Sequence, residues 1–180
     1  MAKKNNQMAM IMNIVIIVLA ILTVCTLFMP VIKVVGESAL GNSEPSFVKG
    51  TDVISATFAG ETPEASGAAS IYWLRTGDEH SFVTTVFCWA YLLTVLVSVA
   101  TLVFAVLGIL GMRFKLVNTV LGAALVVLAI VAFIFTLVVA NKFDADLVIG
   151  KTNGSGAIGA FLMFAGLVAG GFQAYMARSK

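Results

Sequence analysis

The sequence predicts an all-α integral membrane protein: a four-transmembrane-helix bundle with a small, partly β extracellular segment between helices 1 and 2. The first observation is composition, with 60% apolar and 11% charged residues, where soluble domains have about 45–50% and about 25%. The second is that four apolar stretches each reach the roughly 20 residues that a helix needs to cross a bilayer. This pattern excludes a disordered chain, a coiled coil and an ordinary soluble enzyme.

The four stretches are expected to be helices because a backbone in lipid must satisfy its own hydrogen bonds. The predicted helices cover residues 8–32, 77–112, 116–141 and 155–177. Pro30 should end the first of them, since its ring interrupts regular hydrogen bonding. The first helix is expected to stay as an anchor, because its apolar run is too long for a cleaved signal peptide.

The second helix is predicted to begin at a capping box formed by Thr76 and Glu79. Its membrane part is expected at about 89–110, because Trp89 and Tyr91 are residues that prefer the membrane interface. The residues before Trp89 would then project as a stalk on the outer side. The alternative is a tilted helix with Trp89 packed inside the bundle.

The charges predict the topology. Basic residues flank the helix ends on one side of the predicted bundle, whereas all acidic residues lie on the other. Because Lys and Arg favour the cytoplasmic face, both termini should be cytoplasmic, and the expected location is the plasma membrane. The connecting segments are a cytoplasmic tail at 1–7, an extracellular segment at 33–76, a cytoplasmic turn at 113–115, an extracellular loop at 142–154 and a cytoplasmic tail at 178–180.

The extracellular segment is expected to contain short regular elements. The β-branched run at 31–35 predicts a strand that grows out of helix 1, and 47–49 is a second strand that could pair with it. Asp52 should cap a short helical turn, and 61–70 should be mobile. The glycine-rich run at 154–156 is interpreted as a flexible entry to helix 4.

Two aromatic residues, Tyr72 and Trp73, are possible contacts for an outer partner. Packing anchors and membrane-interface anchors are the other two interpretations, because exposed aromatic contacts are uncommon outside binding hot spots.

Small residues follow one face of two predicted helices and allow close helix packing. The possible helix-packing residues are Thr94, Ser98, Thr101, Ala105 and Gly108 on helix 2, and Gly159, Gly166 and Gly170 on helix 4. Packing within the chain is the main expectation. Self-association through the GxxxG motif at Gly166 and Gly170 is the alternative, as is a polar path along the hydroxyl side chains.

Three amides, Asn13, Asn118 and Gln173, lie at a similar depth inside the cytoplasmic helix ends. They could form a hydrogen-bonded cluster that joins three helices, or they could contact lipid headgroups.

Chemically reactive groups are missing from the predicted membrane core, which contains no acidic, basic or histidine side chain. Transporters that couple to ions usually carry such groups. The one histidine, His80, is interpreted as a surface residue, and Cys25 and Cys88 as apolar-like residues at different depths. We therefore predict no enzymatic activity, no catalytic, cofactor-binding or metal-binding residue, and no nucleic-acid partner.

The layout resembles that of claudin-like tetraspan proteins along the whole chain. The W-G-L-W sequence and the cysteine pair of that family's outer segment are absent here, so no claudin role is carried over and no family is assigned. The leading hypothesis is a non-enzymatic interaction or scaffold subunit that contacts the lipid bilayer and another membrane protein or a second copy. The alternative is a channel, or a component of a small-molecule or lipid transporter, formed by oligomerisation.

Overall fold

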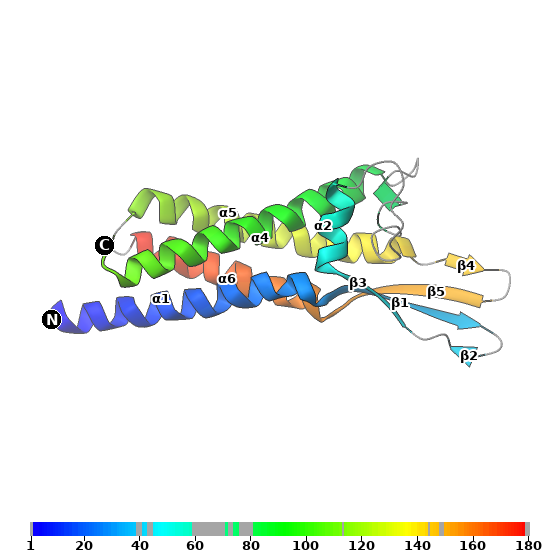
Figure 1. The fold of residues 1–180 in the computed structure, drawn as a ribbon, viewed down its shortest axis with the longest axis horizontal. Helices are drawn as coiled ribbons and strands as arrows, with labels where there is room; N and C mark the ends of the chain where they lie inside the picture. The colour runs from blue at the N-terminus through cyan, green and yellow to red at the C-terminus, as the bar shows by residue number, and fades with distance from the viewer. Residues whose placement is uncertain are drawn as a thin grey trace. The chain divides into compact units, whose positions relative to one another are not determined.

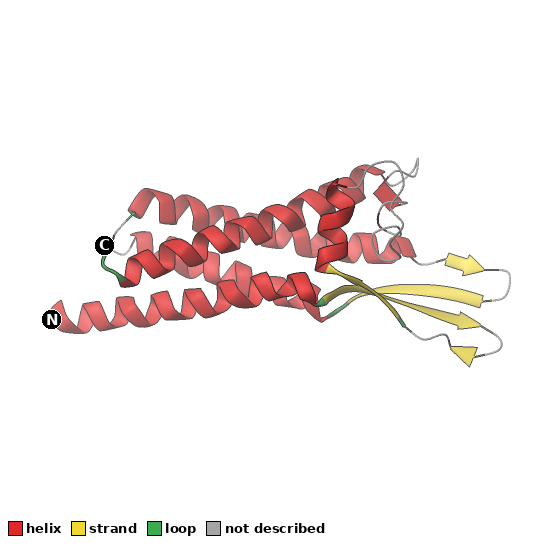
Figure 2. Ribbon diagram, in the orientation of Figure 1, coloured by secondary structure: helices red, strands yellow, loops and turns green. Residues whose placement is uncertain are grey.

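The computed structural model describes residues 2–38, 41–42, 45–58, 71, 74–75, 81–112, 114–143, 145–147 and 150–178. Most of this part of the chain is helical, and a small sheet accompanies the helices (Figure 2). Within these residues, four helices are long and apolar enough to cross a membrane. They are α1 (Ala2–Cys25), α4 (Ser81–Ile109), α5 (Lys115–Ala140) and α6 (Ile158–Arg178).

The chain divides into two compact units. Unit 1 is a bundle formed by segments of all four long helices, and it comprises Met1–Cys25, Leu93–Ile130 and Leu162–Lys180. Glycines let these helices approach closely, because a Cβ on Gly170 would lie 2.6 Å from the Gly122 carbonyl oxygen. Gly166 likewise faces Thr23 of α1. Small residues thus set the spacing between these helices.

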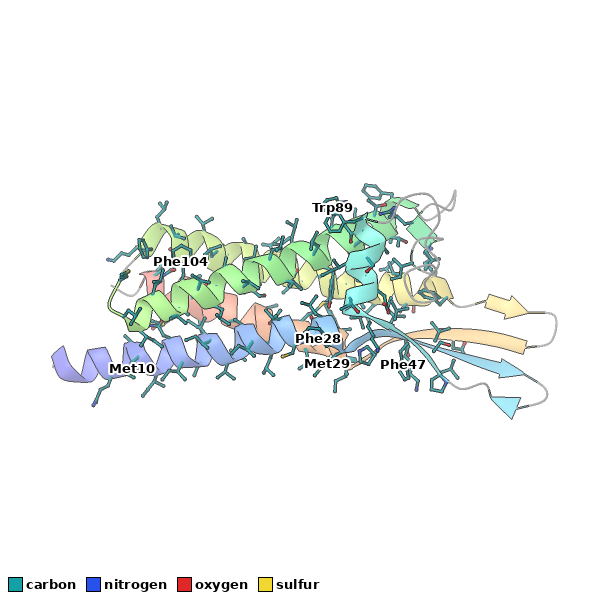
Figure 3. All side chains as sticks on the ribbon, in the orientation of Figure 1. Met10, Phe28, Met29, Phe47, Trp89 and Phe104 are labelled. Carbon is teal, nitrogen blue, oxygen red and sulfur yellow. The ribbon has the colours of Figure 1, made fainter. Side chains whose placement is uncertain are left out.

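Many large apolar side chains of unit 1 are exposed, while many of its small and hydroxyl side chains are buried. Its buried positions include small and hydroxyl side chains: Ala20, Thr23, Thr94, Ser98, Thr101, Ala105, Ala129 and Ala169. Its exposed positions include large aliphatic and aromatic side chains: Met10, Ile14, Val18, Leu96, Val99, Val103, Val120, Val127 and Phe164. Figure 3 shows such side chains along the outside of the helices, with Met10 among them.

The α4 helix ends in a Schellman motif. Gly111 has a φ of 87°, a left-handed conformation that glycine adopts without steric cost. The Met112 N–H donates to the Leu107 carbonyl at 3.0 Å, and the Gly111 N–H donates to the Gly108 carbonyl at 3.2 Å. This motif stops the helix, so α5 can begin at Lys115 after a short connection.

Unit 2 comprises Thr26–Leu92 and Val131–Phe161, and it contains the sheet. Its strands are β1 (Pro30–Ser38), β2 (Gly41–Asn42), β3 (Ser46–Lys49), β4 (Ala145–Leu147) and β5 (Gly150–Gly156). The order is β2-β1-β5-β4, and β3 pairs with β1. The predicted pairing of 47–49 with the first strand is confirmed, since Phe47 lies opposite Lys33 and Val48 opposite Ile32.

The prediction for 154–156 was wrong. These residues belong to β5, which runs antiparallel to β1 from the Ile32–Gly156 pair to the Ser38–Gly150 pair (Figure 1). The α6 helix consequently begins at Ile158 rather than at 155. Glycines weaken a strand on their own, but Gly154 passes directly against the Ala140 carbonyl, where a Cβ would overlap it. Close approach to the end of α5 therefore explains the glycine.

A short helix, α2 (Gly50–Phe58), follows β3. Asp52 was expected to be its N-cap, but the helix begins earlier. The Asp52 carboxylate instead accepts the Lys49 N–H at 2.9 Å, which is the role of the third helical residue in a capping box. At the other end, the Arg75 guanidinium donates to the carbonyls of Ala56 and Thr57, and so satisfies the last turn of the helix.

The aromatic residues of α4 in unit 2 have different environments. Trp89 is 46% exposed and stacks edge-on against Phe58 of α2, with ring centroids 6.0 Å apart. Tyr91 was expected at the interface as well, but its side chain is fully buried. Its hydroxyl lies 3.0 Å from that of Thr26, because a phenol in a protein interior needs a hydrogen-bond partner.

Several sequence predictions lie outside the described residues. They are the capping box of Thr76 and Glu79, the mobile stretch at 61–70, His80, and the aromatic pair Tyr72 and Trp73.

Candidate functional site

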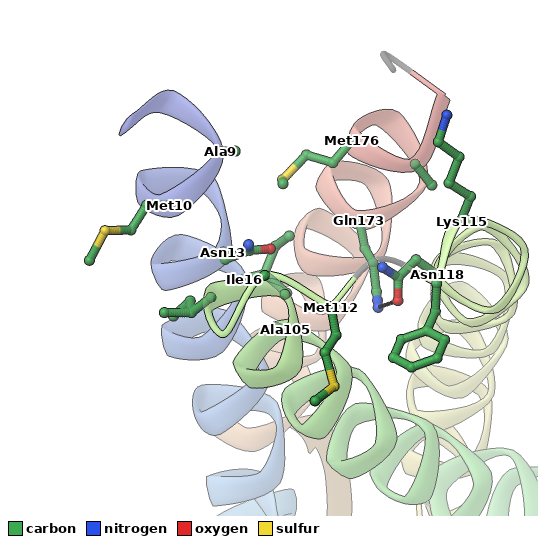
Figure 4. Close-up of a pocket in the computed structure, with 15 residues that line it drawn as sticks. Ala9, Met10, Asn13, Ile16, Ala105, Met112, Lys115, Asn118, Gln173 and Met176 are labelled. Carbon is green, nitrogen blue, oxygen red and sulfur yellow. Dashed lines mark hydrogen bonds between the residues drawn. The ribbon is translucent and has the colours of Figure 1, made fainter. Parts of the chain in front are cut away.

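A pocket of about 370 Å³ lies within unit 1, and all four long helices contribute to it. The lining residues are Ala9, Met10, Asn13, Ile16, Ala105, Gly108, Ile109, Gly111, Met112, Phe114, Lys115, Asn118, Gln173, Met176 and Ala177. Met112 of the Schellman turn and Lys115 at the start of α5 are among the lining residues that Figure 4 labels. Its size lies in the usual range of ligand pockets, about 300–1,000 Å³.

The pocket brings together the three amides that the sequence places at similar depth. The Gln173 side chain donates from Nε2 to the Asn118 Oδ1 at 3.3 Å (Figure 4). Asn13 lines the same pocket from α1, and its Nδ2 would lie 3.0 Å from a Cβ on Gly108. One hydrogen bond of the predicted cluster, between Gln173 of α6 and Asn118 of α5, is therefore confirmed, and the third amide, Asn13 of α1, lines the same pocket.

Gln173 is only 4% exposed, and its Oε1 has no hydrogen-bond partner in the part of the chain that the structure describes. A buried carbonyl without a partner costs about 1–3 kcal/mol. Since the side chain lines the pocket, a bound molecule with a hydrogen-bond donor would remove this cost.

The charged side chain among the described lining residues of the pocket is basic. Lys115, at the first residue of α5, is among the lining residues, and none of these described residues is acidic. The start of a helix also carries partial positive charge. The pocket is therefore suited to an electron-rich ligand rather than to a cation.

The hydroxyl stripe of α4 is buried. Thr94, Ser98 and Thr101 are each at most 2% exposed. Ser98 donates to the Thr94 carbonyl at 2.7 Å, the local bond expected of a helix hydroxyl. Thr101 differs, because among the described residues its Oγ1 has no hydrogen-bond partner.

The other predicted packing residues contact neighbouring segments of the same unit. A Cβ on Gly159 would lie 2.7 Å from the Pro30 carbonyl oxygen, and Gly166 and Gly170 face Thr23 and Gly122. Ala105 is buried, and Gly108 faces Asn13. The GxxxG face of α6 is thus in contact with α1 and α5 of its own chain.

The sheet has one edge that the sequence did not predict as a feature. Within the described ranges, β3 pairs with β1 only. Phe47 of β3, Lys33 of β1 and Ser155 of β5 lie in one row on the same face. Phe47 is 46% exposed, so an aromatic ring stands at this edge. The other possible contacts, Tyr72 and Trp73, lie outside the described residues.

Sequence reasoning missed the pocket itself, because a cavity depends on the spacing of helices that are far apart in the chain. In the described ranges, no three His, Cys, Asp or Glu side chains gather into a possible metal site. Cys25 and Cys88 are free thiols.

Comparison with protein-family models, curated proteins and solved structures finds no match to this chain.

Proposed function

We propose that this protein is a non-enzymatic, integral plasma-membrane interaction subunit with both termini in the cytoplasm. Many large aliphatic side chains of unit 1 are exposed, although its interior holds many small and hydroxyl residues. Large exposed apolar patches on a water-soluble monomer are rare, whereas lipid tails would cover this surface at no cost. The lysines and arginines at one set of helix ends favour a cytoplasmic location for that end.

The sheet is the observation that supports an interaction role. The segment after α1 and the segment between α5 and α6 pair through β1 and β5, so two separate connections form one folded element. Strand β3 stands at its edge with Phe47 exposed. An open strand edge is a template for another strand. The partner that fits is an extended segment of another membrane protein, with an apolar side chain opposite Phe47.

The conduit alternative has less support. A polar path would need hydroxyls that face water, but Thr94, Ser98 and Thr101 are buried, and Ser98 is hydrogen-bonded to its own helix. The glycines of α6 contact segments of the same chain, which favours packing as their role.

Site-specific photo-crosslinking in native membranes tests the interaction. A photoreactive residue replaces Phe47 in one variant and Ser155 in the control. Both positions are exposed and lie in the same row, but they stand two strand spacings apart, about 10 Å. We expect one discrete crosslinked species from position 47 and none from position 155. Equal crosslinking at both positions, or none at either, would contradict an edge partner.

A further inference from the structure

We propose that the unit 1 pocket binds the glycerol-phosphate headgroup of an anionic lipid from the inner leaflet. This inference rests on the membrane placement proposed above. The pocket is lined from all four long helices, and its walls carry amides, one lysine and apolar side chains.

The unpartnered carbonyl oxygen of Gln173 indicates what one part of the ligand must supply. Gln173 lines the pocket, and its Oε1 is buried and has no partner among the described residues. The Nε2 of the same amide is already used by Asn118. The ligand must therefore offer a hydrogen-bond donor, and a glycerol hydroxyl supplies one.

The hydrogen-bond donors that line the pocket indicate that a second part of the ligand is electron-rich. Asn13 and Asn118 carry amide N–H groups, and Lys115 adds an ammonium group at the start of α5. Asn118 can donate from Nδ2 while its Oδ1 accepts from Gln173. Phosphate oxygens accept such bonds strongly, and the described lining contains no carboxylate to repel them.

The apolar walls fit the rest of a lipid. Ile16, Ile109 and Met112 line the pocket beside the amides, and Met side chains adapt to irregular shapes. Basic pockets between transmembrane helices on the cytoplasmic side are known as a physical setting for anionic headgroups. One amphiphile would thus satisfy both the polar and the apolar parts of the lining.

Native mass spectrometry of the full-length chain in detergent tests this site. Phosphatidylglycerol and phosphatidylcholine with identical acyl chains are titrated separately. Phosphatidylcholine has the phosphate but no headgroup hydrogen-bond donor. We expect phosphatidylglycerol to bind about tenfold more tightly, which corresponds to about 1.4 kcal/mol. Equal affinities for the two lipids would overturn the proposal.

Variants locate the binding. Gln173→Met keeps the length of the side chain and removes the amide, and we expect the affinity for phosphatidylglycerol to fall by about tenfold. The control is Asn141→Met, which removes an exposed amide in unit 2 and should leave binding unchanged. Circular dichroism checks that each variant is folded.

A second variant keeps the test decisive if Gln173→Met does not fold. A Cβ at Gly108 would lie 3.0 Å from Asn13 Nδ2, so Gly108→Ala should displace this amide and weaken phosphatidylglycerol binding. Unchanged affinity in the folded variants would overturn the site.

Free glycerol 3-phosphate distinguishes the source of the ligand. Competition by it with phosphatidylglycerol would show that the headgroup alone suffices and that a soluble phosphoester can occupy the pocket. If it does not compete while the lipid binds, the acyl chains are required. Alkaline extraction of native membranes tests the placement separately, because release of the chain would contradict the membrane proposal without affecting glycerol 3-phosphate binding.

Discussion

The phenolic oxygen of Tyr91 lies 3.0 Å from Oγ1 of Thr26, and both side chains are buried. Within unit 2, this hydrogen bond joins α4 to Thr26, the first residue after α1. Gly50, the first residue of α2, lies against the same pair, since a Cβ there would be 2.6 Å from the Thr26 carbonyl oxygen. Three segments therefore meet at one hydrogen-bonded point.

Replacing Tyr91 with Phe should destabilise the protein by about 1–2 kcal/mol, because the Thr26 hydroxyl loses a buried partner. Tyr175→Phe is the matched control, since Tyr175 is 65% exposed and should tolerate the same change. Chemical unfolding in detergent micelles measures both. Equal stabilities of the two variants would contradict a structural role for the Tyr91 hydroxyl.

Neighbouring glycines of α6 should respond oppositely to alanine. A Cβ on Gly170 would lie 2.6 Å from the Gly122 carbonyl oxygen, whereas a Cβ on Gly171 would meet nothing within 4 Å. We expect Gly170→Ala to destabilise unit 1 by about 1–3 kcal/mol through overpacking. Gly171→Ala should be neutral or stabilising by up to about 1 kcal/mol through helix propensity. Thermal unfolding followed by circular dichroism compares them, and a similar loss in both would argue against the α5–α6 contact.

The unpartnered hydroxyl of Thr101 should slightly lower the unfolding free energy of the protein. Thr101→Val keeps the shape of the side chain and removes a buried polar atom that has no partner among the described residues. We expect a gain of about 1 kcal/mol in unfolding free energy. The control, Thr136→Val, removes a hydroxyl that donates to the Ala132 carbonyl at 2.6 Å and should show no gain. A loss of stability in Thr101→Val would instead indicate an unseen partner for its hydroxyl.

The proposed topology is tested with single cysteines in intact cells. In a background without Cys25 and Cys88, we expect Ser155→Cys to react with a membrane-impermeant maleimide, because Ser155 is an exposed residue of β5. Asn5→Cys and Arg178→Cys should react only after permeabilisation, since the positive helix ends favour the cytoplasm. Labelling of either terminal position from outside would reverse or break the assigned orientation.

The helices were predictable because their signal is local. Uninterrupted apolar runs locate α1, α4, α5 and α6, and the β-branched residues after Pro30 mark β1. The predicted end of the first helix at 32 was wrong, because α1 ends at Cys25 and the chain enters β1 at Pro30. Strand β5 was not predictable, because Gly-Lys-Thr-Asn-Gly-Ser-Gly has little strand propensity of its own. It becomes a strand because β1 offers its backbone as a partner, and such pairing depends on residues more than a hundred positions away.

The candidate pocket likewise has features that the sequence predicts and features that depend on the tertiary structure. The sequence by itself determined which side chains lie near one set of helix ends, namely Asn13, Asn118 and Gln173, because depth along an apolar helix follows from counting residues. Only the tertiary structure decided that Gln173 bonds Asn118 and leaves one carbonyl without a partner among the described residues. The reason is that rotation and spacing of packed helices depend on contacts such as Gly170 against Gly122. Residue order alone does not specify these contacts.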